Sequence, residues 1–159
     1  MSVAFTKESD AEAVAADLPD RPIPAHANLV TAPGLAQIDA ELASARAVYD
    51  AARASDAISA DRSAMARATR DLRYWSARRA SAQLVEARPA DGSAGFGTKV
   101  SFKRPDGRQQ TYAIVGDDEA DPAQGSVSYV SPLARAAMGK IVGDVVMLAG
   151  HEVEITAIG

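Results

Sequence analysis

Apolar residues in the first half of the chain recur at alternating intervals of three and four, the spacing of helices that pack along a heptad seam. The first series runs through Leu35, Ile38, Leu42, Ala45, Tyr49 and Ala52. The second runs through Met65, Ala68, Leu72, Trp75 and Ala82, with Arg79 as an imperfect member. A turn within residues 56–61 brings Leu42 beside Trp75 when the seams pair end to end. Residues 29–87 are therefore predicted to form an antiparallel coiled-coil hairpin.

The hydrophobic period changes to two in the second half of the chain, which is typical of half-buried strands. Residues 88–95, RPADGSAG, have the composition of a linker. Beyond them, TKVSFKR, QQTYAIV, SVSYV, DVVML and HEVEITAI are predicted strands, and Asp106-Gly107 and Gly150 mark turns. Ser131, Pro132 and Gly139 cap and bound a short helix. The fold class is α+β, with a small antiparallel sheet and one helix over residues 96–159.

Residues 1–28 differ from both halves: they carry five acidic and two basic residues, with three prolines near their end. This composition predicts a flexible acidic tail. A net charge of −4 argues against a protein that coats nucleic acid by charge alone. Sequence-specific DNA binding is not expected either. The chain has no cysteine, which excludes disulfides and cysteine-ligated zinc, and no run long enough to span a membrane. A cytoplasmic protein without membrane partners is the expectation.

The C-terminal motifs resemble a known family. FGTKVSF, YAIVGDDEADPAQGSVSYVSPLARAAMGKIVGDVV and HEVEITAI, together with LVTAPGLAQIDAEL at the entry into the coiled coil, are similar to bacterial Gre transcription factors of the GreA/GreB type. The resemblance covers residues 29–159 and implies an FKBP-like C-terminal domain. It also implies that the chain is not an enzyme but binds bacterial RNA polymerase and places its hairpin in the secondary channel, modulating transcription elongation. Polymerase docking is implied at Ser131, Pro132 and Leu133.

In this family, acidic residues at the hairpin tip help to hold a magnesium ion of the polymerase, which then cleaves its own backtracked RNA. The resemblance places Asp56 on the family's aspartate, whereas Ser59 stands at the position of its glutamate. Asp61 is a second candidate ligand if the turn brings it beside Asp56. Each arm also lacks about one heptad, which withdraws the tip by roughly 10 Å. Two readings follow: stimulation of transcript cleavage with a shared magnesium ion, or occupation of the channel without cleavage, which is favoured.

Further positions have more than one interpretation. Arginines crowd the second helix and predict contact with RNA or polymerase, or a solvated face paired with the first helix: Arg62, Arg67, Arg70, Arg73, Arg78 and Arg79. The acidic run from Asp117 to Asp121 lacks the spacing of a calcium loop and is predicted to be solvated. A regulator of nucleoside diphosphate kinase is an alternative function, because such proteins share the C-terminal domain. Prolyl isomerase activity is not expected from so few aromatic residues.

Overall fold

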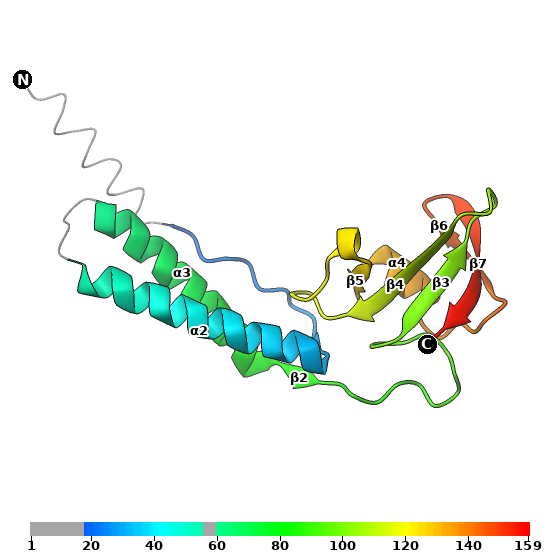
Figure 1. The fold of residues 1–159 in the computed structure, drawn as a ribbon, viewed down its shortest axis with the longest axis horizontal. Helices are drawn as coiled ribbons and strands as arrows, with labels where there is room; N and C mark the ends of the chain where they lie inside the picture. Colours follow the sequence, from blue (N-terminus) through cyan, green and yellow to red (C-terminus); the bar gives the residue numbers. More distant parts are fainter. Residues whose placement is uncertain (1–17, 56–59) are drawn as a thin grey trace, which may run out of the picture. The chain divides into compact units, whose positions relative to one another are not determined.

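The computed structural model describes residues 18–55 and 60–159 and divides the chain into two compact units (Figure 1). The first unit contains the residues up to Ala27 and Ile38–Ser81. The second contains Asn28–Gln37 and Ala82–Gly159. The predicted tail before Leu18 and the predicted turn at residues 56–59 lie outside the described residues.

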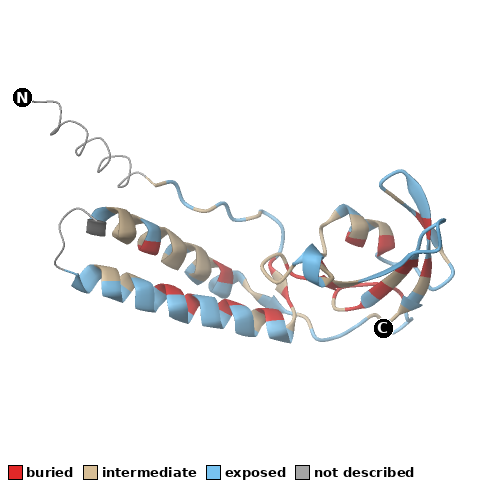
Figure 2. Cartoon of the chain, turned by 45° about the horizontal axis from the view of Figure 1, so that its top comes forward, coloured by how far each residue is buried: buried red, intermediate tan, exposed pale blue. Residues whose placement is uncertain are grey.

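Two helices form the hairpin of the first unit: α2 (Ala32–Ala54) and α3 (Ala60–Ser81) run antiparallel to each other (Figure 1). Ile38 and Leu42 of α2 and Ala68 of α3 are buried. Figure 2 shows buried stretches on both helices of the hairpin. Ala45 is also buried, and the larger seam residues Leu35, Tyr49, Leu72 and Trp75 are half-buried. With 22 and 23 residues, the helices are each roughly 35 Å long.

The seam near the end of α3 differs from the prediction by one residue. Arg79, the predicted seam member, is exposed, and its Nε forms an ion pair with Asp39 at 2.5 Å. The inward position belongs to Arg78, of which only 1% is exposed. A heptad seam continues after Trp75 by either three or four residues. The spacing alone therefore does not distinguish the two arginines, and here the step is three.

The second unit contains a five-stranded sheet in the order β5-β4-β3-β7-β6. Its strands are β3 (Lys99–Lys103), β4 (Gln109–Val115), β5 (Ser126–Ser128), β6 (Val145–Leu148) and β7 (His151–Ile158). All its pairs are antiparallel, as predicted, except β4 with β5, which is parallel. The chain crosses over between these two strands through the short helix η1 (Pro122–Gln124), and a crossover produces parallel pairing. β1 (Leu29–Val30) and β2 (Gln83–Leu84) form a separate parallel pair.

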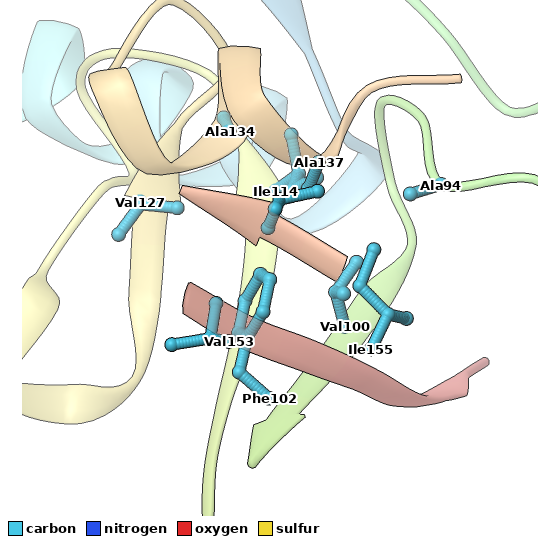
Figure 3. Packing of buried hydrophobic residues seen from close by; sticks show 10 residues of the cluster. Ala94, Val100, Phe102, Ile114, Val127, Ala134, Ala137, Val153 and Ile155 are labelled. Carbon is cyan, nitrogen blue, oxygen red and sulfur yellow. The ribbon is translucent and has the colours of Figure 1, made fainter. Parts of the chain in front are cut away.

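One face of the sheet forms the core of the second unit under helix α4 (Pro132–Ala137). Ala134 and Ala137 of the helix are fully buried against sheet residues (Figure 3). The sheet side chains of this core come from alternate strand positions: Val100, Phe102, Ile114, Val127, Val146, Val153 and Ile155. The α+β fold class is thus confirmed, with one short helix packed on the sheet.

The end of the segment predicted as a linker belongs to the core instead. Ser93 and Ala94 are buried, and the backbone of Ala94 exchanges hydrogen bonds with Gly139 and Lys140 after α4. Asp91 accepts hydrogen bonds from the Ser93 hydroxyl at 2.7 Å and from its backbone N–H at 3.0 Å. These hydrogen bonds lower the pKa of Asp91 below its ordinary value. The small residues of this segment indicated a linker, although Ser93 and Ala94 are packed in the core.

Within the described part of the chain, no helix is both long enough and apolar enough to cross a membrane.

The turn between β6 and β7 offers a stability test. Leu148 pairs with His151, so the loop contains only Ala149 and Gly150, with φ values of 48° and 80°. Such a two-residue hairpin favours Asn-Gly, because a side chain with Cβ other than Asn or Asp is strained at positive φ. We expect Ala149→Asn to raise the free energy of unfolding by about 1 kcal/mol, measured by urea denaturation. Ala149→Val should lower it, and equal stability of the two variants would contradict the turn geometry.

Candidate functional sites

A groove with a volume of 510 Å³ lies on the second unit between the start of α4 and the β6–β7 turn. Ser131, Pro132 and Leu133 line it on the helix side, and the segment from Leu148 to His151 lines it on the turn side. Residues of the sheet, and Arg104 directly after β3, complete the lining: Phe102, Arg104, Gln110, Tyr112, Val127 and Val153. The lining is mainly apolar, and its polar groups are uncharged or exposed. This surface suits an apolar protein segment better than acid–base chemistry.

The sequence around Ser131 fixes the helix side of this groove. Ser131 is the N-cap of α4 in an extended conformation, and its hydroxyl accepts a hydrogen bond from the Ala134 N–H at 3.2 Å. Pro132 follows at the first helical position, where its missing N–H loses no helical bond. Pro132 is exposed, whereas Leu133 is half-buried and packs against the core. All three residues assigned to docking by resemblance therefore line one groove.

A second groove, with a volume of 300 Å³, lies along α3 in the first unit. Arg62, Arg70 and Arg73 line it, together with Met65, Ala66 and Thr69 between them. These positions are about one, two or three helical turns apart and share one face of the helix. Arg67 does not line this groove; its Nη1 donates to the Ser63 hydroxyl at 2.8 Å. Of the six arginines named from the sequence, the structure thus gathers three, Arg62, Arg70 and Arg73, in this groove.

Two residues of the predicted tail, Leu18 and Asp20, line the other side of the arginine groove. The Asp20 carboxylate forms an ion pair with Arg73 at 3.2 Å. The acidic composition of residues 1–28 does not indicate this contact. The available signal was the proline spacing around Arg21, because Pro19, Pro22 and Pro24 restrict the backbone to extended conformations.

The acidic loop is more than a solvated surface. Glu119 accepts a hydrogen bond from the Thr31 hydroxyl, and the same hydroxyl accepts one from the Gly34 N–H at 3.1 Å. The Asp118 carbonyl accepts from the Gln37 amide at 3.3 Å. A carboxylate near the first turn of a helix is stabilised by the helix dipole. The loop therefore holds the start of α2 within the second unit, which corrects the prediction for Glu119.

The side chains of the candidate magnesium ligands, Asp56 and Asp61, lie outside the part of the chain that the structure describes. Asp56 lies outside the described residues, and Asp61 lies in the first turn of α3 with its side chain outside them. Within residues 18–55 and 60–159, no group of three or more His, Cys, Asp or Glu residues is placed to hold a metal ion.

Comparison with known proteins identifies the second unit. The C-terminal domain model of the GreA/GreB transcription elongation factors matches residues 89–159. GreB of Neisseria meningitidis serogroup B is 40% identical over 95 residues, which cover 56% of this chain and 58% of that protein. GreA of Desulfovibrio desulfuricans is 38% identical over 98 residues, covering 60% and 55% of the two chains. The chain thus spans somewhat more than half the length of these relatives.

Solved structures give a weaker likeness. Gfh1, the GreA factor homolog 1 of Thermus thermophilus, aligns over 84% of this chain and 99% of its own, with 22% identity and a TM-score of 0.40. The family assignment rests on the sequence matches: residues 89–159 form a domain of the GreA/GreB C-terminal type. The likeness to the Gre family is thus carried by this C-terminal domain, which is less than half of the chain.

Proposed function

We propose that the chain is a transcription factor that binds bacterial RNA polymerase and places its helical hairpin in the secondary channel. The observation that carries this proposal is the GreA/GreB-type domain with Ser131, Pro132 and Leu133 lining one apolar groove. An apolar groove with a proline at its edge suits a protruding segment of a partner protein. The partner in this proposal is the polymerase, as the relatives' names as elongation factors suggest.

The arginine groove supports a role for the hairpin beyond filling the channel. Arg62, Arg70 and Arg73 carry donors suited to phosphate oxygens, and backtracked RNA in the channel presents phosphates. In this proposal, the arginines contact RNA or the polymerase beside it, and the chain itself catalyses no reaction. Binding by such contacts weakens as the salt concentration rises.

The favoured form of the proposal is channel occupation without stimulated cleavage. Ser59 stands where the family pattern has a glutamate, so one carboxylate for a shared magnesium ion is missing from the sequence. The helices are also short, at 23 and 22 residues. Asp56 and Asp61 remain the candidates for the cleavage-stimulating alternative, with the ion supplied by the polymerase.

Transcript cleavage by a deliberately backtracked RNA polymerase tests the proposal. We expect the wild-type chain to release no additional RNA fragments but to inhibit cleavage stimulated by a standard Gre factor in proportion to its concentration. Fragment release by wild type that is lost in Asp56→Ala or Asp61→Ala would favour the cleavage alternative. Absence of both cleavage and competition would contradict polymerase binding, and capture of nucleoside diphosphate kinase would then identify the other class.

A further inference from the structure

We propose that residues 18–27, here called the strap, are an intramolecular competitor for the arginine groove of α3 and must leave it before the groove can bind phosphate. This inference rests on the proposed function, because it concerns the groove that would contact RNA. It adds a form of regulation that is built into the N-terminal segment of this chain.

Specific contacts hold the strap on α3. The Arg21 guanidinium lies 3.8 Å from the centre of the Tyr74 ring and 5.4 Å from that of the Trp75 ring. Its Nη1 also forms an ion pair with Asp71 at 3.5 Å. Leu18 is half-buried beside the apolar residues of the groove. One cation thus binds two aromatic rings and one carboxylate, which anchors a segment without regular secondary structure.

The strap also places a negative charge where a phosphate would bind. Asp20 forms an ion pair with Arg73, one of the three groove arginines. A carboxylate and a phosphate use the same guanidinium donors, so Arg73 cannot give its full set to both. Leu18 and Asp20 form one wall of the groove. A phosphate can therefore use Arg73 together with Arg62 and Arg70 only after Asp20 has released Arg73.

Replacing Arg21 tests the proposal, because competition by the strap predicts tighter RNA binding, whereas the loss of a positive charge alone predicts weaker binding. Removing a positive charge from a protein normally weakens its binding to RNA. Arg21→Ala, however, removes the anchor of the strap and should free the groove. The predicted tightening is about three- to tenfold, the size expected for one exposed cation–π contact and one exposed ion pair. Arg21→Lys keeps the charge and part of the ring contact, and should remain close to wild type.

The experiment measures binding of a short fluorescent single-stranded RNA to the full chain by anisotropy at low salt. The matched control is Arg46→Ala, which removes the same charge from an exposed position of α2 outside the strap and the groove. We expect tighter binding for Arg21→Ala and unchanged or weaker binding for Arg46→Ala. Adding Arg73→Ala to Arg21→Ala should abolish the gain. Emission of Trp75, the single tryptophan, should change in wild type as RNA displaces Arg21.

The competition is overturned if Arg21→Ala binds the RNA no more tightly than Arg46→Ala while thermal unfolding shows that both variants are folded. It is equally overturned if no variant binds the RNA. Because this assay contains no polymerase, either result leaves the docking groove of the second unit untouched. Failure of the wild-type chain to bind polymerase would, in contrast, contradict the proposed function and leave the RNA result standing.

Discussion

Leu133→Glu is expected to weaken binding to RNA polymerase by about 30- to 100-fold, the loss typical of a central apolar anchor. Leu133 lines the docking groove beside Phe102 and Tyr112, where the lining is mainly apolar. A glutamate there places a carboxylate in a surface that the partner dehydrates, and an unpaired charge loses its hydration without compensation. The measurement is the Kd of the labelled chain for purified core polymerase.

Leu133 also packs against the core, so a second variant separates docking from folding. Pro132 is exposed at the first turn of α4, and a glutamate at that position favours the helix through its dipole. Pro132→Glu should therefore keep the melting temperature and still weaken binding. Arg135→Glu is the matched control, because Arg135 lies on the same helix but does not line the groove. Equal affinities for the Pro132 and Arg135 variants would contradict docking at this groove.

The periodic parts of the fold could be predicted from the sequence because burial repeats with the geometry of each element. Ile38, Leu42 and Ala68 follow heptad spacing, and these residues are buried in the hairpin. Val100 and Phe102 alternate with exposed or half-buried neighbours in β3, as a half-buried strand requires. Local signals of this kind depend only on residues a few positions apart, so one sequence is enough to read them.

Features that depend on distant partners could not be predicted in the same way. The parallel pairing of β5 with β4 follows from the path of the chain through η1, which no periodicity records. The choice of Arg78 over Arg79 depends on Asp39, 40 residues away from Arg79. In each case, the interaction joins segments that are far apart in the sequence, and no periodic pattern of residues indicates which segments meet.

The groove of the second unit, where docking is proposed, shows both situations in one site. Ser131 and Pro132 could be identified from the sequence as the start of a helix because N-caps have local signatures, whereas their assignment to docking came only from the family resemblance. The segment from Leu148 to His151 had no such signal as a groove wall, since only the β6–β7 turn brings it beside α4. The prediction of the arginine groove from the sequence was incomplete for the same reason. Its acidic side comes from Asp20, 53 residues away from Arg73. A site between elements becomes visible only when the fold places both sides.

Gly116→Ala is expected to lower the free energy of unfolding of the second unit by about 2–3 kcal/mol. A Cβ on Gly116 would lie 2.3 Å from the carbonyl oxygen of Leu29 in β1, which is far inside van der Waals contact. The Cβ is fixed to the backbone of residue 116, and the oxygen belongs to the backbone of Leu29, so neither atom can rotate away. β1 must therefore shift from its pairing with β2. For a domain of this size the melting temperature should fall by roughly 10 °C or more.

Gly34→Ala is the matched control for this clash. A Cβ on Gly34 would lie 2.5 Å from Oε2 of Glu119, an equally short approach but to the end of a flexible side chain. Glu119 can rotate at the cost of its hydrogen bond to Thr31, and alanine favours the helix by about 1 kcal/mol over glycine. The two effects nearly cancel, so Gly34→Ala should change the stability by less than about 1 kcal/mol. Stability is measured by thermal unfolding of the full chain. If Gly116→Ala lost as little stability as Gly34→Ala, less than about 1 kcal/mol, β1 would not be held rigidly against Gly116.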